Sequence, residues 1–328
     1  MIKVTVVIPA YNAAATIRDC LGCLASQSYA EPYEVIVVDD GSTDDTPGLV
    51  AREFPKVKLL RQANSGPAAA RNNGAKAAAG GLVFFTDSDC APMRDWLERM
   101  AEPFAANPEV AGVKGVYRTR QRQLAARFVQ IEYEDKYDLM AGHEYIDFID
   151  TYSAGFRKEI FNSMGGYDCS FPVACSEDAE FSFRLANKGY KMVFVPGAAV
   201  YHIHPDAFTA YVKKKFKFAY WRMLAVKKNP NKLVRDSHTP QVMKLQLLLA
   251  PAVLVLAAGA PFCPYSRASF AVSALLYLLL SLPFVVKAAR KDGAVGLVSP
   301  GYLFARSLAQ FLGVLMGSID VFLLKKYK

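Results

Sequence analysis

A short apolar run, Leu82 to Phe85, is followed directly by two acidic residues, Asp87 and Asp89. These two carboxylates lie so close in the chain that they repel each other unless a positive charge stands between them. A divalent cation such as Mg²⁺ or Mn²⁺ takes oxygen ligands and often shares its shell with phosphates, so this spacing is suited to a metal site. The alternative is a solvated turn, because aspartate is common wherever a strand ends.

A second acidic loop, VVDDGSTDDT at residues 37–46, and a basic residue, Arg71, offer complementary groups. A carboxylate of Asp39 or Asp40 can accept a hydrogen bond from a nucleobase N–H, and the ring of Tyr11 can stack on the base. The guanidinium of Arg71 can reach a diphosphate. Each group also has a structural explanation, since the loop is an ordinary strand-to-helix connection and Arg71 can pair with a loop acid.

The residues before Pro92 predict the scaffold that brings these side chains together. Strands are indicated at residues 3–9, 34–38, 57–60 and 82–85, with helical segments between them. This alternation predicts a parallel sheet that helices cover on both faces. Ligands of such sheets bind beyond the carboxyl ends of the strands, where Tyr11 and both acidic pairs follow, so we expect one site there. After Pro92 the pattern becomes mixed.

Seven motifs, in this order, resemble those of the family 2 glycosyltransferases, which have the glycosyltransferase A type fold. They are VVIPAYNA (6–13), VVDDGSTDDT (37–46), GPAAARNNGAKAA (66–78), FTDSD (85–89), GGYD (165–168), SEDAEFSFRL (176–185) and VYHIHP (200–205). The resemblance covers about residues 1–225. It implies an α/β fold with a Rossmann-like, mostly parallel sheet, followed here by an α-helical membrane region.

The resemblance also implies a role for each matching residue. Asp178 is the expected general base for the attacking sugar hydroxyl, a role that supplies about 10²–10⁴-fold. The expected ligands of Mg²⁺ or Mn²⁺ are Asp87, Asp89 and His202, and the expected contacts to the nucleotide sugar are Pro9, Tyr11, Asp39, Asp40, Arg71, Asp87 and Glu177. Two alternatives stay open: the acids of residues 176–178 can merely cap a helix, and His204, expected on the same strand face, competes with His202.

The implied reaction is an inverting, metal-dependent transfer of one sugar from a nucleoside-diphosphate sugar. Processive synthases of this family carry a Gln-x-x-Arg-Trp motif, which the nearest stretch, KFAYWRM at residues 217–223, lacks. The expected acceptor is a hydroxyl of a lipid-linked glycan or a lipid. The alternatives are a polyprenyl-phosphate glycosyltransferase or polysaccharide synthase of the same family, a nucleotidyltransferase, or a non-catalytic membrane protein that binds sugar nucleotides.

The last third of the chain is apolar enough to enter a membrane. Residues 245–266 and 268–286 carry no charge, and each is close to the roughly 20 residues needed to cross a bilayer. Residues 293–324 are interrupted by Arg306 and Asp320, so whether they span the membrane or lie along its surface is left open. With no signal-peptide pattern at the N-terminus, we expect a multi-pass inner-membrane protein whose catalytic domain is cytoplasmic.

The net charge of +9 is concentrated between residues 205 and 244, where aromatic residues alternate with lysine and arginine. This composition predicts a basic amphipathic segment on anionic lipids, rather than a nucleic-acid partner. We therefore expect a cytosolic domain at residues 1–228, including this segment at 205–228, and a membrane region at 229–328. A stripe suited to close helix packing leaves a homo-oligomer through the membrane helices open; it consists of Arg306, Gln310, Gly313, Gly317 and Asp320.

Overall fold

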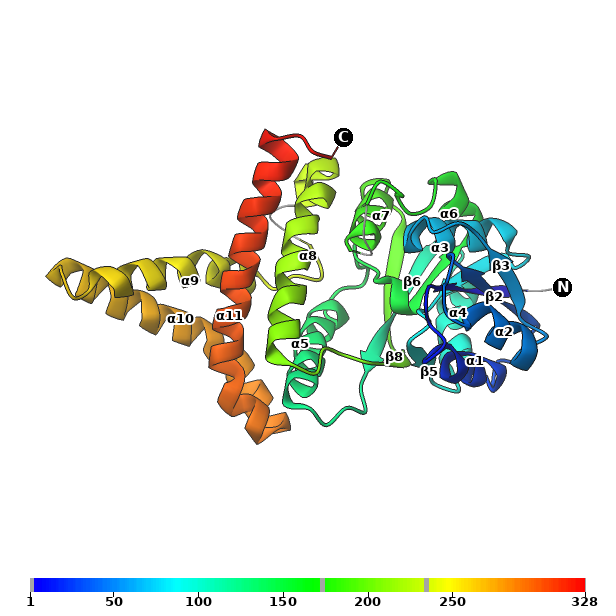
Figure 1. The fold of residues 1–328 in the computed structure, drawn as a ribbon, viewed down its shortest axis with the longest axis horizontal. Coiled ribbons are helices and arrows are strands. Elements are labelled where there is room, and N and C mark those ends of the chain that lie inside the picture. The colour runs from blue at the N-terminus through cyan, green and yellow to red at the C-terminus, as the bar shows by residue number, and fades with distance from the viewer. Residues whose placement is uncertain (1–2, 172–174, 233–235, 328) are drawn as a thin grey trace. The chain divides into compact units, whose positions relative to one another are not determined.

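The computed structural model describes residues 3–171, 175–232 and 236–327, which form two compact units (Figure 1). Unit 1 contains the residues up to Arg120, then Met140–Ile203 and Asp236–His238. Unit 2 contains Gln121–Leu139, residues 204–232 and the chain from Thr239 onwards. The chain therefore crosses between the units more than once.

Unit 1 is built on one eight-stranded sheet with the strand order β3-β2-β1-β4-β7-β6-β8-β5. The strands are β1 (Val4–Ala10), β2 (Tyr33–Asp39), β3 (Lys58–Arg61), β4 (Leu82–Phe85), β5 (Cys90–Pro92), β6 (Val110–Arg118), β7 (Ala154–Arg157) and β8 (Lys191–His202). Strands β1 to β4 pair in parallel, and so do β6 and β8. Strand β7 is antiparallel to β4 and β6, and β5 is antiparallel to β8.

The predicted α/β class is confirmed, and the sheet is mixed because β5 and β7 pair antiparallel with their neighbours. Helices cover both faces of the sheet, as neighbouring strand residues show. Phe84 packs against Trp96 and another aromatic residue of α4, while Phe85 packs against α6. The helices of unit 1 are α1 (Ile17–Ala25), α2 (Thr46–Glu53), α3 (Pro67–Ala77), α4 (Trp96–Ala106), α6 (Lys158–Ser163) and α7 (Glu177–Asn187), with a 3₁₀ turn, η1, at Thr151–Ser153.

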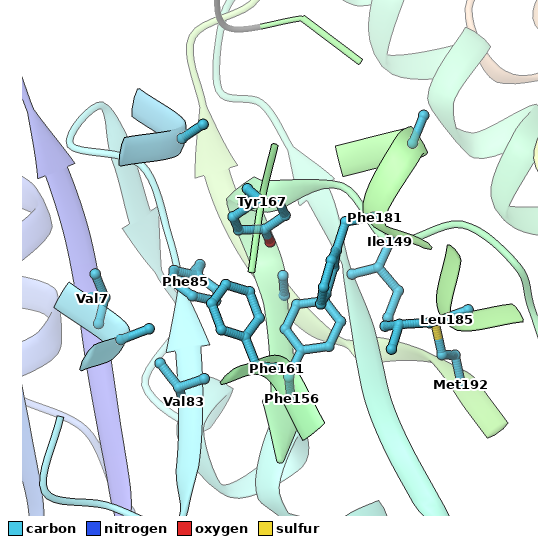
Figure 2. Packing of buried hydrophobic residues seen from close by; sticks show 14 of the residues in the cluster. Val7, Val83, Phe85, Ile149, Phe156, Phe161, Tyr167, Phe181, Leu185 and Met192 are labelled. Carbon is cyan, nitrogen blue, oxygen red and sulfur yellow. The ribbon is translucent and has the colours of Figure 1, made fainter. Parts of the chain in front are cut away.

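An aromatic cluster forms the core on the α6 and α7 side of the sheet (Figure 2). Its members are Phe85, Phe156, Phe161, Tyr167 and Phe181, with neighbouring ring centroids 5.0–6.5 Å apart. Aromatic pairs in such geometries contribute about 0.5–1.5 kcal/mol each beyond their buried area. Because Phe85 ends β4, this core fixes the start of the acidic segment that follows the strand.

The GGYD segment needs glycine for a steric reason. Gly166 has a φ of +67°, and a Cβ there would lie 2.4 Å from Asn72 Oδ1. Asn72 of α3 donates from Nδ2 to the carbonyl oxygen of Tyr167 at 2.7 Å and accepts from the Tyr167 N–H at 2.9 Å. The tight turn therefore holds Tyr167 against α3.

Unit 2 is helical, and three of its helices are long and apolar enough to cross a membrane. These are α9 (Gln241–Gly259), α10 (Pro264–Lys291) and α11 (Gly293–Ser318), which continues as a π-helical turn, η3, over Ile319–Leu323. The remaining elements are α5 (Leu124–Ala141), α8 (Phe208–Lys228) and the 3₁₀ turn η2 (Pro230–Lys232). The two apolar segments predicted with a break near residue 267 are α9 and α10, and their break lies earlier, at residues 260–263.

Helices α8 and α11 lie side by side (Figure 1) because two glycines let their backbones approach. A Cβ on Gly313 would lie 2.5 Å from the carbonyl oxygen of Phe216, and one on Gly317 would lie 2.4 Å from that of Tyr220. The Tyr220 hydroxyl donates to Asp320 at 2.5 Å. The glycine face that the sequence leaves available to a second copy is therefore covered by α8 of the same chain. The boundary expected after residue 228 stays a prediction, and α8 packs within unit 2.

A buried ion-pair group joins α5, α8 and α11. Glu132 of α5 contacts Lys215 Nζ at 2.5 Å and Arg306 Nη1 at 3.1 Å. Burial alone would raise the pKa of Glu132, but these two cations lower it to about 2. One lysine of the basic segment therefore serves internal packing, since a buried carboxylate that lost its partners would be strongly destabilising.

Candidate active site

The carboxyl ends of β1 and β2 place the first group of predicted residues. Tyr11 follows β1 with 51% of its surface exposed, whereas Pro9 is buried inside that strand. Asn12 has a left-handed backbone with a φ of 50°. Its Oδ1 accepts from the backbone N–H of Thr43 at 2.8 Å, and its own N–H donates to Ser42 Oγ at 2.9 Å. Asn12 thereby ties the two loops together and leaves the ring of Tyr11 exposed at their edge.

Asp39 and Asp40 are both buried and serve the loops around them. Asp39 Oδ2 accepts from Arg61 Nε at 3.1 Å, and its Oδ1 accepts from the Ser42 N–H. Asp40 accepts hydrogen bonds from three groups of the loop before α3, namely Gln62 Nε2 at 2.8 Å, the Ser65 N–H at 2.8 Å and the Gly66 N–H at 2.9 Å. The acidic pair thus holds the loop that leads to α3, and its contact to a base stays a prediction.

Arg71 of α3 joins two acidic segments that are far apart in the sequence. Its side chain is 4% exposed, with Nη2 at 2.7 Å from Asp87 Oδ1 and Nη1 at 3.1 Å from Glu177 Oε1. Burial would lower the pKa of Arg71, but the two carboxylates raise it above its ordinary value. The positive charge that contacts Asp87 is therefore supplied by the protein itself. The pairing of Arg71 with a loop acid is present, and its contact to a diphosphate stays a prediction.

A further acidic pair, Glu177 and Asp178, lies at the beginning of α7. Ser176, just before the helix, has a left-handed backbone with a φ of 72°, which is uncommon for a residue with a side chain and frequent at functional sites. Glu177 is buried, and burial and the neighbouring Asp178 raise its pKa to about 7. Burial also raises the pKa of Asp178, although its side chain keeps some exposed surface. A partly accessible carboxylate with a raised pKa is suited to act as a base.

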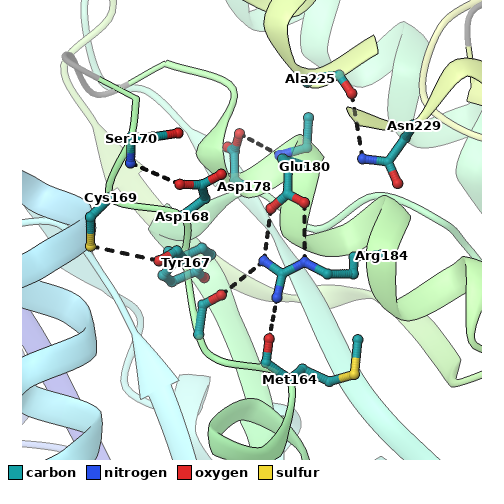
Figure 3. Close-up of polar contacts among 12 residues, drawn as sticks. Met164, Tyr167, Asp168, Cys169, Ser170, Asp178, Glu180, Arg184, Ala225 and Asn229 are labelled. Carbon is teal, nitrogen blue, oxygen red and sulfur yellow. Dashed lines mark hydrogen bonds and ion pairs between the residues drawn. The ribbon is translucent and has the colours of Figure 1, made fainter. Parts of the chain in front are cut away.

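Helix α7 is fixed to the preceding turn by Arg184 (Figure 3). Arg184 pairs with Glu180 through Nη2 at 2.7 Å and through Nε at 3.0 Å. It also donates to the carbonyl oxygens of Met164 and Gly166, the latter at 2.9 Å. Asp178 lies at the other end of this helix and accepts from the Ala179 N–H at 2.7 Å. The helix therefore holds Asp178 by packing and hydrogen bonds rather than by a flexible loop.

The remaining predicted metal ligands meet at the paired ends of β5 and β8. His202 Nδ1 lies 3.5 Å from Asp89 Oδ2, and Asp89 is 41% exposed. Together with Cys90 they bring three donor atoms within 4.8 Å of one another, a set that fits a divalent cation. Asp87 points instead to Arg71, so the two aspartates of the motif have different partners.

The ring of His202 is held by a stack of tyrosines. Tyr117 of β6 stacks on His202 with centroids 4.4 Å apart, and Tyr152 stacks on Tyr117. The buried Lys114 pairs with Asp150 and donates to the Tyr152 hydroxyl at 3.2 Å. Residues that fix the ring of a metal-binding histidine tune its affinity for the ion.

The histidine ambiguity of the sequence has a structural basis. Strand β8 ends at His202, whereas His204 lies beyond the strand and belongs to unit 2. His204 Nε2 is 3.1 Å from Gln130 Oε1 of α5, and its ring stacks on Tyr133. Of the two, His202 therefore has the position expected of a metal ligand. Sequence reasoning missed Cys90 and Tyr117, because only the cross-strand register places them beside His202.

Comparisons with known proteins agree on one family. Residues 5–165 match the model of glycosyl transferase family 2. Glycosyltransferase AglE of Haloferax volcanii is 42% identical over 102 residues, which are 29% of this chain and 33% of that protein. An N-acetylglucosaminyltransferase of Azorhizobium caulinodans is 24% identical over 277 residues, covering 77% of this chain and 70% of that protein. Probable glycosyltransferase YdaM of Bacillus subtilis is 28% identical over 236 residues, or 66% of this chain and 54% of that protein.

Solved structures show the same fold. Mannosyltransferase PcManGT from Pyrobaculum calidifontis, in complex with GDP-Man and Mn²⁺, superposes with a TM-score of 0.65 at 24% identity and covers 94% of this chain and 86% of that chain. GalNAc-T7 with UDP, GalNAc and Mn²⁺ gives a TM-score of 0.51 at 17% identity, over 68% of this chain and 51% of that chain. The sheet is thus of the glycosyltransferase A type. Residues 5–165 thus form a domain of the glycosyl transferase family 2 type, in a chain that spans 33% of the length of AglE and 54% of that of YdaM.

Proposed function

We propose that the protein transfers one sugar, with inversion and with a divalent cation, from a nucleoside-diphosphate sugar to a hydroxyl of a membrane-associated acceptor. The observation that carries this proposal is the bridge that Arg71 makes between Asp87 at 2.7 Å and Glu177 at 3.1 Å. It brings the acidic segment after β4 and the acidic start of α7 into one site. A donor held by the first segment is then within reach of a base on the second.

On the donor side, the exposed ring of Tyr11 stacks on the base, and the loops held by Asp39 and Asp40 surround it. Pro9 shapes this edge from within β1, as a buried strand residue. Arg71 and Asp87 lie next to the diphosphate in this arrangement. The GDP-Man bound by PcManGT and the UDP bound by GalNAc-T7 support a nucleoside-diphosphate sugar as the donor class.

On the acceptor side, Asp178 takes the proton of the attacking hydroxyl. Its raised pKa keeps it a better proton acceptor than an ordinary aspartate, and Arg184 and Glu180 hold the helix that carries it. Glu177 stays bound to Arg71 and is not free to attack the sugar. A single base without a covalent nucleophile leads to direct displacement, and hence to inversion at the anomeric carbon.

Asp89 and His202 would hold Mg²⁺ or Mn²⁺, with Asp87 beside them. The ion would neutralise the charge that grows on the departing nucleoside diphosphate. Support comes from the Mn²⁺ present in both solved neighbours. The protein's own part is to orient these ligands, which the tyrosine stack does for His202.

The three apolar helices of unit 2 support an acceptor in the membrane, either a lipid-linked glycan or a lipid. Basic residues along α8, with Lys227 and Lys228 in its last turn, suit anionic headgroups, and those in the last turn of α10 support the same, cytoplasmic side for its end. The expected location is the inner membrane, with unit 1 in the cytoplasm. A homo-oligomer would need a helix face other than the one α8 covers.

The test is release of nucleoside diphosphate by the full-length protein in detergent. A panel of UDP-, GDP- and dTDP-sugars is offered with Mn²⁺, with Mg²⁺ and with EDTA, and a membrane lipid extract supplies the acceptor. We expect one donor to be consumed in a metal-dependent, extract-stimulated reaction that Asp178→Asn lowers about 10²–10⁴-fold without loss of donor binding. Transfer that persists in EDTA, or in Asp178→Asn, contradicts the proposal.

A further inference from the structure

Cys90 lies directly opposite His202 in the sheet. Strands β5 and β8 pair antiparallel with Cys90 against His202, so both side chains point to the same face. Cys90 Sγ lies 3.8 Å from His202 Nδ1 and 3.8 Å from Asp89 Oδ1, while Asp89 Oδ2 lies 3.5 Å from the same nitrogen. A thiol, an imidazole and a carboxylate therefore form one triangle of groups, with one donor atom of each within 4.8 Å of the other two.

The size of this triangle indicates which ions it fits. Zinc binds sulfur at about 2.3 Å and nitrogen or oxygen at about 2.0–2.1 Å, so neighbouring ligand atoms of a tetrahedral site lie about 3.3–3.6 Å apart. The observed separations lie close to that range, at 3.8 Å from Cys90 Sγ to His202 Nδ1 and to Asp89 Oδ1, and 3.5 Å from His202 Nδ1 to the other carboxylate oxygen, Oδ2. A small rotation of the exposed Asp89 carboxylate would let a single oxygen complete the set. Magnesium prefers octahedral oxygen ligands about 3 Å apart and has little affinity for sulfur.

The triangle is also held in place before any ion binds. Cys90 is 1% exposed, and its backbone N–H donates to the Asp87 carbonyl oxygen at 3.0 Å. The imidazole of His202 stacks on Tyr117, which prevents the ring from rotating away. Asp89 is the exposed corner through which an ion can enter. All six cysteines of the chain are free, so no disulfide removes this thiol.

We propose that Cys90 is a ligand for thiophilic divalent cations, above all Zn²⁺, which it binds together with Asp89 and His202. On binding, the thiol gives its proton to solvent as the metal–sulfur bond forms, and no oxidation state changes. The inference rests on the proposed function only in that the catalytic cation uses the same aspartate and histidine. Zinc therefore competes with the catalytic ion and inhibits transfer.

The thiol of Cys90 should strengthen the binding of Zn²⁺ much more than that of Mn²⁺. Zinc binds nitrogen and oxygen sites more tightly than manganese even without sulfur, and a thiolate adds to this difference because manganese gains little from it. We therefore expect Cys90→Ser to weaken Zn²⁺ binding at least tenfold while changing Mn²⁺ binding less than twofold. Inhibition of sugar transfer by Zn²⁺ should move to concentrations at least tenfold higher in this variant.

Cobalt provides a direct test, because a thiolate bound to Co²⁺ produces an intense near-ultraviolet charge-transfer band. Full-length protein in detergent is titrated with Co²⁺, and the band is expected in the wild type and absent in Cys90→Ser. Cys20→Ser is the matched control, since Cys20 is also buried and its thiol donates to the Asp87 carbonyl oxygen at 3.6 Å. Cys169→Ser, at an exposed cysteine, is a second control, and both controls should keep the band.

Co²⁺ binding without this band, or a band that survives Cys90→Ser, overturns the inference and leaves the proposed function standing. Failure of the wild type to bind any divalent cation, together with transfer in EDTA, counts against both. A measurement without substitution guards against misfolding of the variant: the ¹¹³Cd resonance of the wild-type protein should lie in the range of sulfur ligation. A resonance typical of oxygen and nitrogen ligands alone would refute the role of Cys90.

Discussion

Replacing Arg71 by methionine keeps the length of the side chain but leaves Asp87 and Glu177 without their shared partner. Arg71 makes charge-assisted hydrogen bonds of 2.7 Å and 3.1 Å to these two carboxylates. Each such bond contributes about 1.5–3 kcal/mol, and breaking a buried ion pair costs about 3–5 kcal/mol. Because Asp87 is 26% exposed and partly solvated, the lower end applies. We expect the free energy of unfolding of unit 1 to fall by about 3–4 kcal/mol at pH 8.

The pH dependence identifies the cause of this loss. Burial and Asp178 already raise the pKa of Glu177 to about 7, and removal of Arg71 raises it further. A carboxyl whose pKa is higher in the folded state contributes stability at low pH that is lost as the pH rises through that pKa. Below this pKa Glu177 is neutral and needs no cation, so the difference between Arg71→Met and wild type should shrink at pH 5.5.

The assay is thermal unfolding of the full-length protein in detergent, followed by the fluorescence of Trp96, which is buried in unit 1. A Trp221→Phe background removes the signal of unit 2. A loss of about 3–4 kcal/mol corresponds to a decrease in Tm of about 6–16 °C for a domain of this size. Glu177→Gln in the same background should recover part of the loss. A decrease below 2 °C at pH 8, or an equal decrease at both pH values, would refute the reasoning.

Three further predictions concern the base, the histidine and the membrane helices. Because burial raises the pKa of Asp178, kcat/KM should decrease at acidic pH with an apparent pKa above that of an ordinary aspartate. A pH–rate profile whose acid limb has an apparent pKa near 3.8 contradicts this. Tyr117→Leu should weaken Mn²⁺ binding about tenfold, because it frees the ring of His202. Circular dichroism checks that the variant keeps the wild-type fold, and an unchanged Mn²⁺ affinity in calorimetry rules out the positioning role of Tyr117. Gly317→Val should destabilise unit 2 by about 1–3 kcal/mol through its clash with α8, whereas Gly301→Val on the same helix meets open space and should have little effect in a thermal scan.

The sequence predicted the parallel half of the sheet because local patterns determine it. Strands β1, β2 and β4 alternate with helices, and each ends at a polar residue of a recognisable motif. The antiparallel strand β7 was not predicted, since its pairing with β4 and β6 depends on contacts between distant segments. Propensity within a short strand does not specify its partner or direction.

In the candidate site too, local sequence patterns predict some features, whereas others depend on contacts between distant segments. The motif residues Asp89 and His202 were expected to meet, and they lie 3.5 Å apart. Asp87 was expected to bind a cation from solution, which stays a prediction, and in the structure it contacts the guanidinium of Arg71 in α3. Cys90 could not be distinguished from a packing cysteine without the register of β5 on β8. Residue types can thus be read from one chain, whereas their pairing needs the fold.

The close packing of α8 on α11 has a consequence for how the protein is made. Tyr220 and Asp320, which join these helices, are 100 residues apart in the chain. At roughly 5–20 residues per second, α8 leaves the ribosome about 5–20 s before its partner exists. During that interval the basic helix lacks the glycine face of α11, and its apolar side can be covered only by α5 or by lipid. Assembly of unit 2 therefore waits until α11 has been synthesised, so that a chain released before α11 presents quality-control proteases with a helix that lacks its partner.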